Sequence, residues 1–250
     1  MINERTFLKL PTNFGDLCKI YPPSVIEVVG LEEFGMYRAT LTLSQEEIED
    51  AYIDPNEIIP NYNQFIPTPF QYLLITYHQE SEEMRKIILD SFEFFLKEPV
   101  IIVPELEIII IGKTEEELDP DVDLVDPRLI DENNFFEFQN KIRESIGIDA
   151  VAPPNPNEDP RVKRIKAKGR KRDRIKAKQS SQKLGNLLAA ICCMGVGLNP
   201  LNIGEISYAS VGSLIETYQG KEAYDIDIKC LLAGADSKKV KPKYWIKNIE

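Results

Sequence analysis

The residue types that carry most enzymatic and metal chemistry are scarce in this sequence. Histidine occurs once, as His78, and the cysteines are Cys18, Cys192, Cys193 and Cys230. A common zinc site needs four Cys or His ligands at short spacings, and a hydrolase triad needs a histidine beside a nucleophile. Adjacent residues on a helix point about 100° apart, so Cys192 and Cys193 cannot bind one metal ion together. The sequence therefore predicts no catalytic, cofactor-binding or metal-binding residue, and we expect the protein not to be an enzyme.

Two further patterns resemble ligand sites without completing them. Asp119, Asp121 and Asp123 have the alternate spacing of a calcium loop, but the required glycine and the closing glutamate are missing. Gly195 and Gly197 resemble the start of a dinucleotide-binding motif, but no third glycine follows and the preceding pattern is helical. We interpret the aspartates as part of a solvated acidic loop and the glycines as the end of a helix.

The least ordinary feature is a basic segment at residues 161–178. It contains eleven Lys or Arg residues and one acid, Asp173, which leaves a charge of −21 for the rest of a chain whose net charge is −11. Cations would cover most of the circumference of a helix here, so this helix cannot be buried. The candidate partner-binding residues in this segment are Lys163, Arg164, Lys166, Arg170, Arg172 and Arg174.

Three interpretations of the basic segment remain open. It balances charge by packing against the chain's own acidic surface, it binds an acidic protein, or it contacts nucleic-acid phosphates in a salt-sensitive way. No aromatic residue lies among the basic ones, which weakens the case for single-stranded nucleic acid. Because the remainder of the chain is strongly acidic, we expect nucleic acid to be an unlikely partner.

Start and stop signals predict a mixed N-terminal half. Residues 12–16 are rich in turn formers and are expected to form a loop. N-cap candidates precede four helical patterns, at Ser24, Ser44, Ser81 and Asp131. The pattern after Asp131 places Phe135, Phe138, Ile142 and Ile146 on one face. Residues 100–111 are largely β-branched around Pro104, which predicts two short strands joined by a tight turn.

A proline-rich stretch divides the chain. Its composition predicts a linker over residues 151–160, between a mixed domain at 1–150 and a region at 161–250 that combines the basic helix with a helical domain. Helical patterns follow around residues 184–191, 207–219 and 226–232. The predicted fold class is α+β: mostly helical, with a small β-hairpin in the N-terminal domain and a helical C-terminal domain.

The C-terminal region also contains apolar candidates for partner binding. They are Val211, Leu214, Ile215 and Tyr218 on one helical face, and Tyr244 and Trp245 near the end of the chain. A face of this kind is explained equally by core packing and by a partner surface. Both interpretations stay open at this point.

Nothing in the sequence predicts a membrane protein. No apolar run reaches the roughly 18 residues that a membrane span needs. The first eleven residues lack the basic and then apolar pattern of a signal peptide. We therefore expect a cytoplasmic protein.

The order of these features resembles that of tail assembly chaperones from bacteriophages and prophages of Gram-positive bacteria. The resemblance covers most of the chain, although no single motif is diagnostic. The stretches that carry it are residues 17–28, 70–74, 91–95, the strand run from 100, 158–168, 201–210 and 241–246.

The resemblance implies a binding function. Such chaperones hold the tape-measure protein while tail-tube subunits polymerise around it, so both proteins are the expected partners, with possible self-association. The alternatives are a structural protein of the neck or tail that stays in the virion, and a nucleic-acid-binding regulator that uses the 161–178 helix.

Overall fold

The computed structural model describes residues 3–52, 65–114, 116, 128–153, 155, 158–180 and 183–243, and only the backbone of 160, 164 and 174–180. The N-terminal elements are α1 (Glu4–Phe7), β1 (Thr12–Phe14), β2 (Cys18–Ile20), α2 (Val25–Gly30), α3 (Phe34–Thr42), α4 (Gln45–Tyr52), α5 (Pro69–Gln79), α6 (Glu82–Leu96), β3 (Val100–Val103), η1 (Pro104–Leu106), β4 (Ile108–Ile111), β5 (Leu129–Ile130) and α8 (Glu132–Ser145). The C-terminal elements are α9 (Pro160–Ser180), α10 (Leu184–Cys193), η3 (Ile203–Glu205) and α11 (Ser210–Leu232).

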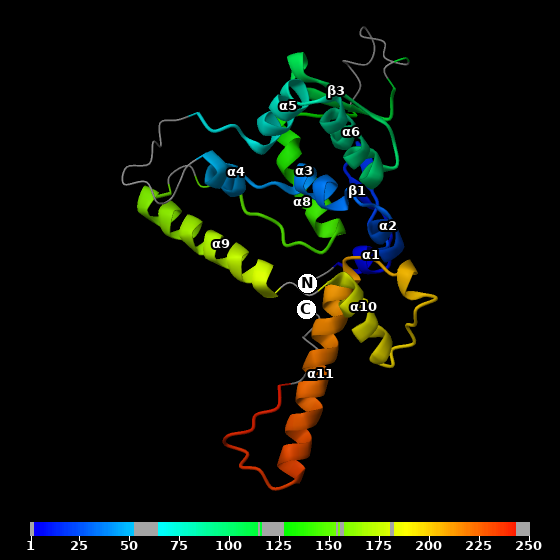
Figure 1. Cartoon of the computed structure of the whole chain (residues 1–250), viewed down its shortest axis with the longest axis vertical. Coiled ribbons are helices and arrows are strands. Elements are labelled where there is room, and N and C mark those ends of the chain that lie inside the picture. The colour runs from blue at the N-terminus through cyan, green and yellow to red at the C-terminus, as the bar shows by residue number, and fades with distance from the viewer. Residues whose placement is uncertain are drawn as a thin grey trace.

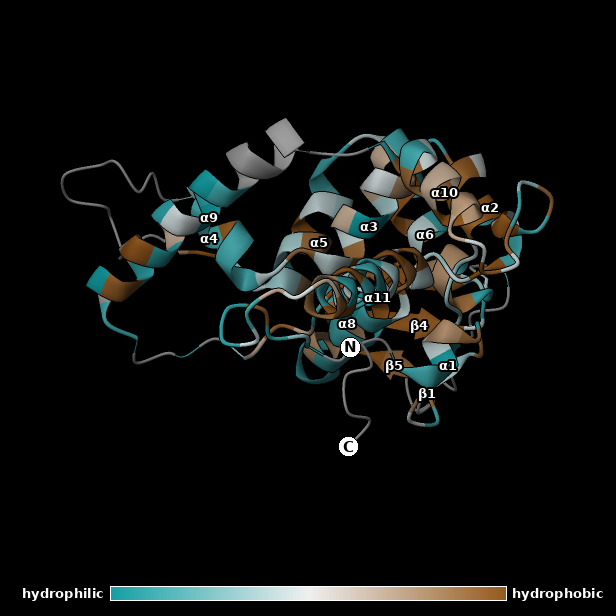
Figure 2. Ribbon diagram, turned by 90° about the horizontal axis from the view of Figure 1, so that it is seen from below, coloured by the Kyte–Doolittle hydropathy of each residue, from teal (hydrophilic) through white to brown (hydrophobic). Residues whose placement is uncertain are grey.

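The predicted strand pair is confirmed and is part of a larger sheet. β3 and β4 are antiparallel, with Val100 opposite Ile111, and the one-turn 3-10 helix η1 joins them. β5 adds a third strand by pairing Ile130 with Ile109. Figure 2 shows β4 and β5 as apolar ribbons with helices beside them. The α+β fold class, mostly helical with small antiparallel sheets, is therefore confirmed.

The predicted loop at residues 12–16 is wrong in part. Thr12–Phe14 forms β1, which pairs with β2 in a second small antiparallel sheet. The turn between them contains Gly15 at a φ of 53°. The sequence lacks a long alternating pattern here because the two strands are short. They are held by tertiary packing, since Phe14 and Ile20 are buried in the core.

The N-terminal core lies between the strands and helices α3, α5, α6 and α8. Phe138 of α8 is fully buried, stacks on Phe92 of α6 at 5.7 Å, and meets Phe14 of β1 edge-on. The whole predicted face of α8 is buried, as are the faces of α5 and α6 that oppose it. This aromatic cluster gives the N-terminal half a fixed frame on which its surface helices rest.

Capping explains where several helices begin. Ser24 caps α2 and Asp131 caps α8, as the sequence predicts, and each also forms a complete capping box, with Glu27 and Asn134 respectively. Ser81 caps α6 by accepting a hydrogen bond from the Met84 backbone N–H. These local hydrogen bonds satisfy donors that a helix N-terminus otherwise leaves unpaired.

A second, smaller apolar cluster attaches the C-terminal helices to α2. Its buried members are Val25 of α2, Ile191 of α10, Ile203 of η3 and Val211 of α11. A backbone bridge between Ser24 and Ser207 lies beside it. The cluster fixes α10 and the first turn of α11 against the N-terminal half.

The prediction of two separate helices over 207–219 and 226–232 is wrong. A single helix, α11, runs through both segments and beyond Gly220. Figure 1 shows α11 extending away from the rest of the molecule. Only Ser210 and Val211 at its start are buried. No helix in the described part of the chain is long and apolar enough to cross a membrane.

Candidate partner-binding surfaces

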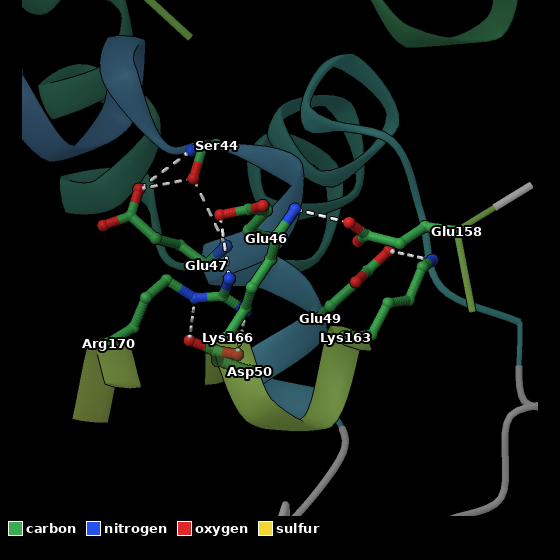
Figure 3. Close-up of polar contacts among 9 residues, drawn as sticks. All are labelled: Ser44, Glu46, Glu47, Glu49, Asp50, Glu158, Lys163, Lys166 and Arg170. Atoms are coloured by element: carbon green, nitrogen blue, oxygen red, sulfur yellow. Dashed lines mark hydrogen bonds and ion pairs between the residues drawn. The ribbon is translucent and has the colours of Figure 1, made fainter. Parts of the chain in front are cut away.

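The basic helix α9 lies beside the acidic helix α4 (Figures 1 and 3). Arg170 donates from Nε and Nη2 to the two carboxylate oxygens of Asp50, at 3.0 and 2.7 Å, and from Nη1 to Glu46 at 2.8 Å. Two helical turns before Arg170, the Lys163 ammonium contacts the Glu49 carboxylate at 3.4 Å. Charge-assisted fork contacts of this kind are stronger than single neutral hydrogen bonds. Part of the basic segment is therefore paired within the chain itself.

Local sequence explains why α4 presents its acids outward. Ser44 donates from its backbone N–H and its hydroxyl to Glu47, which caps the helix at its N-terminus. Ile48 is buried in the body of the protein, so Glu49 and Asp50 lie toward the surface. Residues three and four positions apart share one side of a helix, which gathers the carboxylates where α9 lies.

The N-terminal end of α9 is also held by local contacts. The Asp159 carboxylate accepts a hydrogen bond from the Arg161 backbone N–H at 2.7 Å. Pro160 occupies the first helical position, where its missing N–H costs nothing. Lys166 pairs with Glu158, and this hydrogen bond raises the pKa of Lys166. Hydrogen bonding to Asp50 likewise raises the pKa of Arg170, so both cations stay charged.

A cavity of about 550 Å³ lies beside the contact of α9 with the N-terminal half and is lined by residues of both. Its lining includes Glu132 and Arg143 as well as the α4 and α9 charges. Burial raises the pKa of Glu132, whose carboxylate accepts a hydrogen bond from the Thr68 hydroxyl at 3.0 Å. Arg143 donates hydrogen bonds to the backbone carbonyl oxygens of Thr42 and Asp149, at 2.5 and 2.9 Å. These two charged groups at the cavity are thus already paired, Glu132 with a hydroxyl and Arg143 with backbone carbonyls.

The chemically versatile residues lie apart from this cavity. His78 is exposed near the end of α5, and Cys18 is buried. Burial, with the nearby Glu98 charge, raises the pKa of the Cys18 thiol to about 12. No group of three or more His, Cys, Asp or Glu residues in the described ranges could hold a metal ion. The aspartates 119, 121 and 123 lie outside the described residues.

The apolar candidates on α11 divide into two groups. Val211 is buried in the cluster with α10, and Leu214 and Ile215 pack partly against it, so these three belong to the core. Tyr218 is the last of the predicted face, and its hydrogen bond to Glu222 raises the pKa of its hydroxyl. Beyond Tyr218 the helix leaves the cluster. There Ile226 and Leu232 are 58% and 83% exposed.

The base of α11 adjoins an apolar hollow that the sequence did not reveal. A cavity of about 290 Å³ has a lining that includes Phe7 of α1, Leu8, Val196, Ser207 and Leu214. Phe7, Leu8 and Val196 are exposed, and the buried Ser207 hydroxyl has no hydrogen-bond partner among the described residues. Phe7 ends a four-residue helix and Leu8 is its C-cap, and a helix this short shows no period in the sequence.

The part of the chain that contains α11 is similar to a known family. Residues 176–250 match the family model of the YomV second domain. This is a phage-associated domain. The match begins in the last turn of α9 and includes α10, η3 and the whole of α11. No curated protein and no solved structure gives a significant match.

The match with the YomV second domain indicates a phage-related protein. It covers less than a third of the chain, and residues 1–175 lie outside it. The predicted boundaries at residues 150 and 160 stay predictions. The match does place the projecting helix α11 inside the phage-associated region.

Of the remaining candidates, Arg172 is exposed on α9 and away from the α4 contact. The side chains of Arg164 and Arg174, and all of Tyr244 and Trp245, lie outside the described residues. The structure thus brings together Lys163, Lys166 and Arg170, which pair within the chain, and separates them from the α11 candidates. Among the three interpretations of the basic segment, packing against the chain's own acids describes these three residues.

Proposed function

We propose that this chain is a phage tail assembly chaperone, which binds the tape-measure protein and tail-tube subunits in the host cytoplasm and performs no catalysis. The observation that carries the proposal is the projecting half of α11. It lies within the segment that matches the phage-associated YomV second domain, and it presents apolar side chains to solvent.

The physical case rests on Ile226 and Leu232. Fully burying an aliphatic side chain of this size contributes roughly 1.5–3 kcal/mol. A few such side chains on one helix give a weak contact. Because differences in affinity lie mainly in the rate of dissociation, a weak contact of this kind dissociates readily. A chaperone that leaves before the tail is finished needs contacts of that strength. The tape-measure protein is a long helical partner, which suits an exposed helix.

The test is a pull-down of the tagged full-length protein from prophage-induced cells, with the bound proteins identified by mass spectrometry. The wild-type chain is expected to recover the tape-measure protein and the tail-tube protein. The double variant Ile226→Asp, Leu232→Asp should recover at least about fivefold less of both, since charge on the apolar positions prevents burial.

A matched control is available on the same helix. Ala223→Asp with Cys230→Asp adds the same two charges to exposed α11 positions and is expected to retain both partners. Recovery of a partner set without tail proteins would overturn the proposal. Presence of the protein in purified virions would favour the neck or tail structural alternative, and co-purifying nucleic acid would favour the regulator.

A further inference from the structure

The two sides of α9 differ in what they contact. Lys163 and Arg170, seven residues apart, face α4 and pair with its acids. At about 100° per residue, Arg161, Lys168 and Arg172 share the opposite side of the helix. All three are exposed, and no ion pair joins any of them to another described residue. Pairing within the chain therefore leaves the outer side of α9 positively charged.

We infer that the outer side of α9 binds an acidic amphipathic helix of a partner protein. The inference rests on the proposed function to the extent that both are protein binding, but it uses a surface separate from α11. The contact between α4 and the inner side of α9 is a guide to the groups that a partner helix would present to the outer side. Carboxylates at Glu46, Glu49 and Asp50 meet two cations spaced by seven residues.

The outer side repeats that spacing. Arg161 and Lys168 are seven residues apart, as are Lys163 and Arg170 on the inner side. Two helical turns separate the members of each pair, so a partner helix with carboxylates at positions i, i+3 and i+4 meets the outer pair in the same geometry. Arg172 extends the row by one more turn.

An exposed isoleucine distinguishes a protein partner from nucleic acid. Ile165 is 71% exposed, and its angular position on the helix lies within about 60° of all three outer cations. An amphipathic helix offers an apolar side chain to cover Ile165, whereas a phosphate backbone does not. The charge of −21 on the rest of the chain also repels nucleic acid. The outer side of α9 therefore fits acidic protein better than phosphate.

Such a contact is weak and depends on salt. An exposed ion pair contributes about 0–1 kcal/mol, and exposed charges are screened over about 10 Å at 0.1 M salt. Three cations around one apolar side chain then give reversible binding. The inner pairs do not have to break, so partner binding leaves α9 on α4.

The experiment uses a fluorescein-labelled helical peptide of about 20 residues, rich in Ala and Leu, with Glu at repeated i, i+3 and i+4 positions. Its binding to the full chain is followed by fluorescence anisotropy at roughly 50 and 300 mM NaCl. The variant Arg161→Glu, Lys168→Glu, Arg172→Glu should bind at least about tenfold more weakly. Ile165→Ala alone should bind about threefold more weakly.

The matched control reverses three charges elsewhere. Lys229→Glu, Lys238→Glu, Lys239→Glu changes the net charge equally at exposed positions outside α9 and should bind within about twofold of wild type. If the triple Glu variant of α9 loses helicity by circular dichroism, the Gln variant of the same three residues replaces it and should also bind more weakly.

Three outcomes would overturn the inference. They are equal binding of a peptide with Gln in place of Glu, equal weakening by the control variant, and tighter binding of a DNA duplex than of the acidic peptide. The α11 variant Ile226→Asp, Leu232→Asp should bind the acidic peptide normally. If the wild-type chain does not bind the acidic peptide but still recovers tail proteins in the pull-down, the inference about α9 is wrong and the proposed function stands.

Discussion

Arg170 and Asp50 form a fork of two parallel hydrogen bonds between helices that are 120 residues apart in sequence. The side chain of Asp50 is 11% exposed and that of Arg170 is 23% exposed. Neither of the two apolar clusters among the described residues includes a residue of α9. The ion pairs are therefore the main described contact that keeps α9 on α4.

Replacing Arg170 should loosen α9. Arg170→Ala leaves the mostly buried Asp50 carboxylate without its fork and should cost about 1–3 kcal/mol in the free energy of α9 docking. Trypsin measures this directly, because α9 is dense in Lys and Arg, and cleavage within 161–178 should speed up severalfold. Arg172→Ala, on the exposed side, is the control and should leave the cleavage rate unchanged. Equal rates for Arg170→Ala and wild type would contradict the docking role.

Glu27 should make the protein sensitive to acid. Burial opposes its ionisation, but hydrogen bonds from the Ser24 N–H and hydroxyl and the pair with Lys97 outweigh burial and lower the pKa of Glu27 to about 2. A carboxylate whose pKa is lower in the folded state stabilises the fold above its unfolded pKa. That stability is lost as pH falls from about 4.5 toward 2.

Urea unfolding at pH 7 and at pH 3 tests this dependence. Wild type should lose stability between the two pH values by an amount that Glu27→Gln does not lose. Because the side chain is partly exposed, we expect the difference to be on the order of 1 kcal/mol. Identical pH dependence in both proteins would show that the capping box at α2 does not act through the Glu27 charge.

A side chain at Gly147 should destabilise the fold. Gly147 has a φ of 74°, and an added Cβ would lie 3.1 Å from the Cα and the Cβ of Ala209, just before α11. Gly147→Ala should therefore destabilise by backbone strain of about 1–3 kcal/mol plus the clash. Gly195→Ala is the matched control, since Gly195 has a φ of 70° and open space around it. Thermal unfolding should show a larger loss for Gly147→Ala, and equal losses would exclude the contact with Ala209.

The four cysteines should differ in reactivity. Cys193 and Cys230 are exposed, whereas the buried Cys18 has a pKa of about 12 and almost no thiolate at neutral pH. Ellman's reagent should modify Cys193 and Cys230 in the native protein and Cys18 only after denaturation. The variant Cys18→Ala should show the same native labelling as wild type. A loss of native label in that variant would place Cys18 at the surface.

The sequence predicted the helix starts and the strand pair, because hydrogen bonds between near neighbours determine these features. The caps at Ser24, Ser81 and Asp131 and the strand pair around Pro104 depend on residues within a few positions of each other. α3 escaped prediction because its N-cap, Glu33, makes no side-chain capping bond. α11 was divided in two because Gln219, Gly220, Lys221 and Glu222 interrupt its apolar pattern between Tyr218 and Ile226.

The candidate surfaces were only partly predictable. Charge composition alone identified the basic segment, but no spacing rule links Lys163 and Arg170 to acids more than a hundred residues earlier. Which cations remain outward depends on that pairing. In the same way, Val211 and Ile226 are both apolar residues of one helix, and only the position of α10 makes the first buried and the second exposed.

The anchoring of α11 at one end makes it a lever arm. Its 23 residues span about 34 Å, while its buried residues are confined to the first turn. A tilt of about 10° at that first turn displaces the far end of such a helix by about 6 Å. Small adjustments of packing around Val211 and Ile203 therefore translate into large movements of Leu232. Under the proposed function, this geometry lets one rigid helix reach partner sites at different spacings.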